Sequence, residues 1–247
     1  MTGDEMFLKR IPDKLKADIE QFRSSHTNEV LFFSADSGMG KTYAALSYCA
    51  ENKDSLYFSF RHISTDLALK AFTDRYPNMF NACSTWIDFF DALRDYGKEK
   101  RQTVFFDDVG ERNDKNDFYA VLKNFLDERA SCGVLVVLIG RPWEQIEIPC
   151  KTITIEPLST QEIAETLSVS DKESVDIFCL SAGITKLLSA YDTGISFDEN
   201  VKALLHINSP FYRLMNETMR ECFRTPESYN TLLYAMANGY NRISELA

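Results

Sequence analysis

Histidine and closely spaced cysteine are scarce in this sequence. Its three histidines lie far apart in the chain, and its six cysteines include no Cys-x-x-Cys pair. Zinc sites and disulfide frameworks show tighter spacing, so we expect no metal cluster and reduced, mostly buried thiols, as in cytosolic proteins. The cysteines are Cys49, Cys83, Cys132, Cys150, Cys179 and Cys222.

Long apolar runs and blocks of positive charge are missing as well. The longest apolar run, residues 134–139, is far too short to cross a bilayer, and the N-terminus is too polar for a signal peptide. The formal net charge is −10 and there is no Lys/Arg block, which disfavours non-specific nucleic-acid binding by the chain as a whole. We therefore expect a soluble, cytoplasmic protein with no membrane partner.

What the sequence does have is five short apolar segments, each followed by helix-like residues or a turn. Several are apolar at nearly every position, as expected of parallel strands covered on both faces. Strands that alternate with helices predict an α/β fold with a parallel sheet over residues 1–156. The five predicted strands begin at Val30, Leu56, Thr103, Val134 and Thr152.

The predicted helices of this core lie between the strands. One spans residues 41–51, and another begins at Ser64. A third has Ser84 as its N-cap and Gly97 as its stop, and a fourth ends at Gly133.

After Glu156 the strand signal ends and helical periodicity begins. Residues 157–206 include a capping pattern, Ser159 followed three residues later by Glu162, and predict a small helical domain. Residues 207–247 predict two amphipathic helices and then the opening of another.

The segment SADSGMGKTYA at 34–44 has the spacing of a phosphate-binding loop, or P-loop, which ends in Gly40, Lys41 and Thr42. It directly follows a predicted strand and opens a predicted helix, the context that this motif requires. Gly38 and Gly40 permit backbone angles closed to other residues, so N–H groups turn toward an anion beside a helix N-terminus. Lys41 supplies a cation for the outer phosphates, and Thr42 supplies a hydroxyl for Mg²⁺.

We therefore predict nucleotide binding by this loop and the first residues of the helix. Tyr43 is included because it follows Thr42, although packing within the helix is the favoured interpretation of its ring. The predicted phosphate-binding residues are Asp36, Ser37, Gly38, Met39, Gly40, Lys41, Thr42 and Tyr43.

A second motif, TVFFDD at 103–108, describes a buried strand that delivers a carboxylate to the end of the sheet. We expect Asp107 to lie beside the P-loop and to form a metal site with Thr42, holding Mg²⁺ through water. A catalytic base at Asp108 would have to orient a water toward the γ-phosphate. Aspartate reaches about 1.5 Å less far than glutamate, and a misplacement of about 1 Å can lower a rate about a hundredfold. Asp108 is therefore either a slow catalytic base or only a polar residue at the strand end.

A third motif, LIGR at 138–141, puts a charged residue just past the fourth strand. In this architecture that position lies near the γ-phosphate, so Arg141 is predicted to sense that phosphate or to stabilise charge during its transfer. A surface arginine before Pro142 is the alternative.

With these three motifs in this order, the chain resembles the P-loop ATPases of the STAND class in the AAA+-like lineage, and especially the archaeal-type ATPase family. The resemblance covers nearly the whole chain and implies a three-layer P-loop core with a helical lid at 157–206. It also implies ATP and Mg²⁺ as cofactors, and Phe7 and Arg10 match the family's box near the adenine.

The resemblance further implies that residues 207–247 are a bridge into a winged helix, so that the chain is the N-terminal ATPase part of a longer protein. DNA or a protein would then be the partner of the winged helix. Two positions depart from the family pattern. Thr185 replaces the proline of the lid, which bears on the contact to the base, and Asp108 replaces the glutamate of the Walker B motif, which bears on fast hydrolysis.

Two functions stay open on the sequence. The first is a switch in which ATP and Mg²⁺ bind between the sheet domain and the lid, Arg141 senses the γ-phosphate, and slow hydrolysis to ADP and phosphate releases the lid. The second is a binding module that keeps its nucleotide without turnover and presents the C-terminal helices to DNA or a protein. A small-molecule kinase is disfavoured because residues 157–206 contain no arginine to clamp a transferred phosphate.

Overall fold

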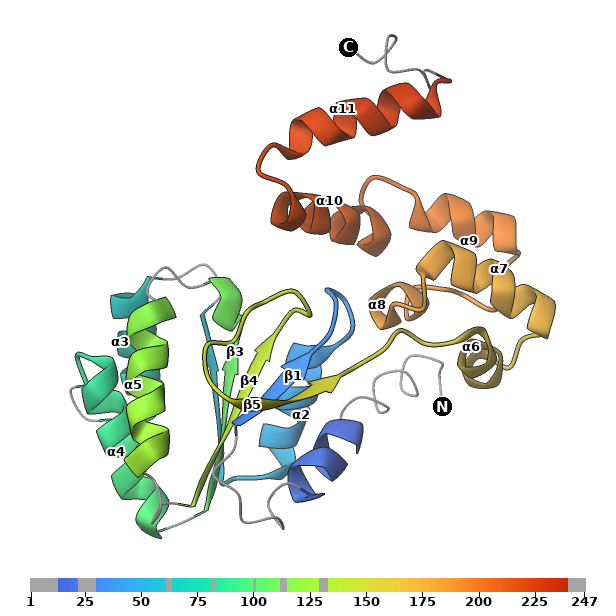
Figure 1. The fold of residues 1–247 in the computed structure, drawn as a ribbon. Coiled ribbons are helices and arrows are strands. Elements are labelled where there is room, and N and C mark those ends of the chain that lie inside the picture. The colour runs from blue at the N-terminus through green and yellow to red at the C-terminus, as the bar shows by residue number, and fades with distance from the viewer. Residues whose placement is uncertain are drawn as a thin grey trace.

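The structure is a computed structural model that describes residues 13–21, 30–60, 64–80, 83–99, 101–111, 115–128 and 133–239, and Figure 1 shows its fold. Five parallel strands form one sheet in the order β2-β3-β4-β1-β5. All five predicted strands are confirmed, each within two residues of its predicted start. They are β1 (Val30–Ser34), β2 (Ser55–Ser59), β3 (Gln102–Asp107), β4 (Val134–Gly140) and β5 (Cys150–Thr154).

Successive side chains of a strand point to opposite faces of the sheet. Both faces are apolar and are covered by helices, so the sheet is the middle of three layers. On β1, Phe32 packs into one apolar cluster and Phe33 into the other. One face is covered by α3 (Thr65–Arg75), α4 (Trp86–Glu99) and α5 (Lys115–Glu128), and the opposite face by α2 (Lys41–Glu51) and a helix at 13–21 (Figure 1). Burial on both faces explains the almost uninterrupted apolar strands.

Phenylalanine fills the layer between the sheet and α3–α5. Phe58 of β2 stacks on Phe106 of β3 with ring centroids 5.6 Å apart, and Phe80 stacks on Phe89 at 4.4 Å. Each such pair contributes about 0.5–1.5 kcal/mol beyond the area it buries. Many of the aromatic residues are therefore core residues.

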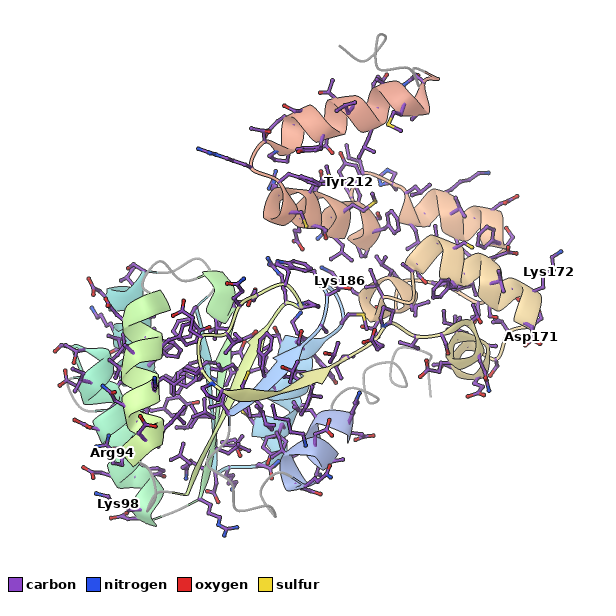
Figure 2. All side chains as sticks on the ribbon, in the orientation of Figure 1. Arg94, Lys98, Asp171, Lys172, Lys186 and Tyr212 are labelled. Carbon is purple, nitrogen blue, oxygen red and sulfur yellow. The ribbon has the colours of Figure 1, made fainter. Side chains whose placement is uncertain are left out.

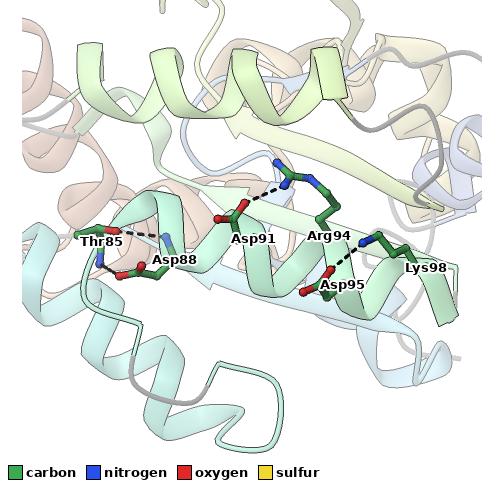
Figure 3. Close-up of polar contacts among 6 residues, drawn as sticks. All are labelled: Thr85, Asp88, Asp91, Arg94, Asp95 and Lys98. Carbon is green, nitrogen blue, oxygen red and sulfur yellow. Dashed lines mark hydrogen bonds and ion pairs between the residues drawn. The ribbon is translucent and has the colours of Figure 1, made fainter.

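Helix α4 corrects two of the predicted boundaries (Figure 3). The N-cap is Thr85, not Ser84, because the Thr85 hydroxyl accepts from the backbone N–H of Asp88 at 3.2 Å while the Asp88 carboxylate accepts from the N–H of Thr85 at 3.0 Å. Gly97 does not end the helix, which runs to Glu99. Its buried carbonyl instead accepts from the N–H of Gly133 at 3.0 Å, so this glycine marks a close approach of the chain.

The residues after β5 are helical, as expected. Ser159 is the N-cap of α6, and its reciprocal bonds with Glu162 form the predicted capping box. A separate apolar cluster that includes Leu158, Ile163 and Leu188 holds these helices together. The helices are α6 (Thr160–Leu167), α7 (Asp171–Ser181), α8 (Thr185–Leu188), α9 (Phe197–Leu204), α10 (Pro210–Cys222) and α11 (Pro226–Ala237). The further helix expected near the C-terminus lies outside the described residues.

The described cysteines are free thiols, but the expectation that most are buried is wrong. Cys49, Cys83 and Cys150 are half-buried, and Cys179 and Cys222 are exposed because α7 and α10 each turn one face to solvent. Within the described part of the chain, no helix is both long and apolar enough to span a bilayer.

Candidate functional site

A cleft of about 490 Å³ opens where the carboxyl ends of β1, β3 and β4 meet. This volume is within the range of about 300–1,000 Å³ usual for small-molecule sites. The loop after β1 forms its floor, the ends of β3 and β4 form one wall, and residues of α8 and α10 form the other. Three predicted motifs, far apart in sequence, therefore meet in one place.

The loop between β1 and α2 has the conformation of a P-loop. Gly38 and Gly40 have φ of 82° and 85°, in the left-handed region that glycine enters without strain. Between them, Met39 is fully buried in the core, which anchors the loop from beneath. Helix α2 begins at Lys41, so its N-terminal dipole points into the cleft, where it favours an anion.

Lys41 lies inside the loop. Its Nζ donates to the carbonyl of Ala35 at 2.5 Å and to that of Asp36 at 3.0 Å. Burial lowers the pKa of Lys41 below its ordinary value, against the opposing charge of Asp107, and nearby Arg141 lowers it further. A bound anion would relieve both effects, so this ammonium is suited to a phosphate.

The metal-site pair predicted from the sequence is in contact. The Thr42 hydroxyl donates to Oδ2 of Asp107 at 2.6 Å, and Asp107 is only 1% exposed at the end of β3. A third residue, which the sequence analysis missed, joins them: the Tyr57 hydroxyl on β2 donates to the same oxygen at 2.7 Å. Tyr57 gave no signal because it sits in a strand that reads as uniformly apolar.

Asp108 lines the cleft in an uncommon backbone conformation, with φ of 57°. Aspartate is among the few residues that tolerate this region. Its Oδ2 accepts from the Ser59 hydroxyl on β2 at 3.4 Å, and its N–H donates to Oδ1 of Asp107 at 2.9 Å. The carboxylate is thus at the cleft but drawn toward β2.

Arg141 follows β4 directly and also lines the cleft. Its guanidinium lies 5.8 Å from the ring centre of Trp143, which is 54% exposed. Arg141 is half-buried at the cleft, as the prediction requires, and its charge helps to lower the pKa of Lys41; its role in sensing the γ-phosphate stays a prediction.

Glu144 is a second residue of the cleft that the sequence analysis missed. Its carboxylate occupies the space that side chains at Gly110 and Gly140 would fill: a Cβ on either glycine would lie 2.2 Å from a carboxyl atom. Two glycines, one after β3 and one ending β4, together make room for this acid. Gly140 belongs to the LIGR motif and Gly110 follows TVFFDD closely, but neither pattern indicates that an acid fills the space beside the two glycines.

Helix α8 contacts the P-loop directly. The Thr185 hydroxyl donates to the carbonyl of Gly38 at 2.9 Å, and the backbone N–H of Lys186 donates to the same oxygen at 3.0 Å. Because a P-loop turns its N–H groups toward the anion, this outward-facing carbonyl is available to α8 without loss of the phosphate site. Thr185, which departs from the resembled family, therefore has a specific contact of its own.

Helix α10 completes the wall. Leu214 and Glu217 line the cleft, and Leu214 lies so close to Gly38 that a Cβ there would be 3.0 Å from it. Lys186, labelled in Figure 2, forms an ion pair with Glu217 at 3.7 Å. The site thus extends beyond residue 206, where the sequence placed the end of the lid.

The remaining predicted residues divide into three groups. Ser37 and Tyr43 line the cleft. Tyr43 is 45% exposed, so the expectation that its ring packs within the helix is wrong. Asp36 and Met39 belong to the loop but not to the lining of the cleft. Arg10 lies outside the described residues.

The donor set fits a hard divalent cation. A hydroxyl and a carboxylate in contact, Thr42 and Asp107, match the oxygen ligands and the small number of protein groups that Mg²⁺ takes beside a phosphate. Among the described residues, no group of three or more His, Cys, Asp or Glu side chains could hold a metal by itself. The lining includes three cations, Lys41, Arg141 and Lys186, together with four acids, Asp107, Asp108, Glu144 and Glu217. A polyphosphate whose charge is partly neutralised by a metal suits this mixture of charges better than a metal-free polyphosphate does.

No protein-family profile matches the sequence, and no curated protein is significantly similar to it. Several solved structures are similar to this chain. A Signal Transduction ATPase with Numerous Domains (STAND) protein with a tetratricopeptide repeat sensor, from Pyrococcus horikoshii, matches at 16% identity and a TM-score of 0.50, over 77% of this chain and 32% of that one.

Two further structures match more of the chain. RuvB from Thermotoga maritima matches at 13% identity and a TM-score of 0.46, over 96% of this chain and 84% of that one. A Drosophila ORC structure bound to DNA matches at 16% identity and a TM-score of 0.48, over 92% of this chain and 65% of that one.

These likenesses concern the fold. The parallel sheet in the order β2-β3-β4-β1-β5, followed by C-terminal helices, confirms the predicted α/β fold with a parallel sheet. The chain spans about a third of the length of the Pyrococcus protein. At these identities, function has to be argued from the cleft itself.

Proposed function

We propose that this chain is a Mg·ATP-binding switch with slow hydrolysis, in which residues 157–206 form a lid over the P-loop. The observation that carries the proposal is the convergence on one cleft of the P-loop, the Thr42–Asp107 pair and α8, which is hydrogen-bonded to Gly38. A phosphate-binding loop and a helix attached to that loop are the minimum needed for nucleotide binding to change the position of the lid.

Each cleft residue has a role in this proposal. The N–H groups of residues 36–42 and the ammonium of Lys41 bind the phosphates. Mg²⁺, held by the Thr42 hydroxyl and through water by Asp107, neutralises phosphate charge. Arg141 senses the γ-phosphate from the end of β4, where it lines the cleft. The nucleotide shifts the lid only by its difference in affinity for the open and closed forms.

Asp108 is the proposed base that orients water for hydrolysis. A competing function, a module that binds nucleotide without turnover, is favoured by one observation: the Ser59 hydroxyl already donates to Oδ2 of Asp108. That bond draws the carboxylate toward β2, and aspartate is already short for the task of orienting a water. We therefore expect turnover to be slow in comparison with the median enzyme, which turns over at about 10 s⁻¹.

Single-turnover hydrolysis of Mg·ATP, with binding measured in parallel, separates the two functions. We expect Lys41→Ala to abolish binding, and Asp108→Asn to lower the cleavage rate by about 10²–10⁴-fold while ATP stays bound. Asp95→Asn, which removes an exposed carboxylate of α4 (Figure 3), is the matched control and should leave both unchanged. Tight binding with cleavage that is absent, or indifferent to Asp108, would replace the switch with the binding module.

A further inference from the structure

The Tyr57 side chain is buried in apolar surroundings where a phenylalanine ring would pack equally well, so packing does not account for its hydroxyl. Its ring lies on β2, 8% exposed, in the apolar cluster between the sheet and α2, beside Phe105 on the neighbouring strand. Burying a hydroxyl in such surroundings costs free energy unless it finds a partner. The partner is Oδ2 of Asp107, at 2.7 Å.

This bond nearly completes the hydrogen bonding of Asp107. Its Oδ2 accepts from both Thr42 and Tyr57, and its Oδ1 accepts from the N–H of Asp108. A carboxylate has about four acceptor positions, so three donors leave about one, on Oδ1, for a metal-bound water. The three bonds come from α2, β2 and the β3 end, and together they prevent rotation of the carboxylate.

The Tyr57 hydroxyl keeps the proton that this hydrogen bond needs. Burial, followed by the negative charge of Asp107, raises the pKa of Tyr57 far above its ordinary value, so the hydroxyl stays protonated and donates. Thr42 likewise gives its one proton to Asp107, which leaves its oxygen lone pairs free to ligate a cation.

We propose that Tyr57 is a positioning residue for the metal: it fixes the Asp107 carboxylate so that one oxygen faces a water of Mg²⁺. This inference rests on the proposed function and adds a residue to its metal site. Partners of this kind orient ligands at metal sites generally, and their loss costs about 10–100-fold in metal affinity or activity.

The test is Tyr57→Phe, which keeps the ring and removes the hydroxyl. Tyr48→Phe is the matched control, since Tyr48 is equally buried at 4% exposure and packs edge-on against Phe105 at 5.5 Å, but lies on α2. The probe is Mn²⁺, followed by its electron paramagnetic resonance during titration of the protein–ATP complex. Thermal unfolding and metal-free ATP binding are measured on each variant.

We expect Tyr57→Phe to weaken Mn²⁺ binding about tenfold, while metal-free ATP binding changes less than about twofold. Tyr48→Phe should match the wild type in both. Equal Mn²⁺ affinity in Tyr57→Phe and wild type, or an equal loss in both tyrosine variants, would overturn the role of Tyr57. Wild-type protein that binds neither ATP nor Mn²⁺–ATP would instead refute the proposed function.

Discussion

At the scale of the residue, the groups of the cleft take their properties from neighbours that lie far away in sequence. Lys41 shows this most clearly: burial lowers its pKa, the negative charge of Asp107 acts in the opposite direction, and the positive charge of Arg141 lowers the pKa further. A lysine exposed in a loop, without these neighbours, would keep a pKa near its ordinary value. The lowered pKa makes binding by this residue sensitive to alkaline pH.

The affinity for Mg·ATP should therefore fall as the pH rises through the lowered pKa of Lys41. The sign follows from charge: a bound polyphosphate favours the ammonium and raises its pKa, so above the pKa of the free protein each binding event takes up a proton. Between the lowered pKa of the free protein and the higher pKa of the complex, affinity should fall by up to about tenfold per pH unit.

Lys41→Arg is the control for this titration, because a guanidinium stays charged throughout the range. Dissociation constants measured by fluorescence of a nucleotide analogue at a series of pH values give the comparison. A wild-type profile that coincides with that of Lys41→Arg would show that Lys41 is not the group that titrates.

Sequence alone identified Lys41, Thr42, Asp107 and Arg141, since each has a fixed place in a motif next to a strand end. It missed Tyr57, because the bond to Asp107 depends on the register of β2 against β3. It missed Glu144 as well, because the space for that carboxylate is made by glycines on two different elements. Contacts that depend on strand register, or on space left by glycines, leave no recognisable pattern in the local sequence.

At the scale of the element, strands were predicted better than helix ends. Burial on both sheet faces dictates an apolar residue at nearly every position, which is a strong signal. The ends of α4 were wrong by one or two residues, because Ser84 and Thr85 are both good caps and only the geometry at Asp88 decides between them. The contact between α8 and the P-loop is likewise visible only in three dimensions.

That contact yields a prediction for Thr185→Val, which keeps the shape of the side chain and removes the hydroxyl. Gly38 would retain the bond from the Lys186 N–H, so the change removes one of two attachments. A hydrogen bond of this kind contributes about 0.5–1.5 kcal/mol, so ATP affinity should fall about two- to tenfold if the attached lid is the form that binds.

Ser189→Ala is the control for Thr185→Val. The Ser189 hydroxyl also lies in the cleft wall, but it donates locally to the carbonyl of Lys186 at 3.0 Å and does not reach the P-loop. Isothermal titration of both variants with Mg·ATP gives the comparison. An unchanged affinity in Thr185→Val, or an equal loss in Ser189→Ala, would show that the hydrogen bond from Thr185 does not contribute to nucleotide binding.

At the scale of the whole molecule, the cleft unites segments that the sequence assigned to three domains. The P-loop and the strand ends belong to residues 1–156, Thr185 and Lys186 to residues 157–206, and Leu214 and Glu217 to residues 207–247. Figure 1 shows α8 and α10 on the side of the sheet where β1 ends. A nucleotide in the cleft would therefore touch all three segments, and the state of its γ-phosphate would affect the C-terminal helices.

Hydrogen exchange of the whole chain with Mg·ATP, with Mg·ADP and without nucleotide tests this claim most directly. We predict slower exchange in residues 36–42 with either nucleotide, and slower exchange in α8 and α10 only with ATP, by about tenfold for about 1.4 kcal/mol of added stability. Helix α4, on the far face of the sheet, serves as the internal control. Equal protection of α8 and α10 by ATP and ADP would contradict a γ-phosphate switch, and no protection of residues 36–42 would contradict nucleotide binding itself.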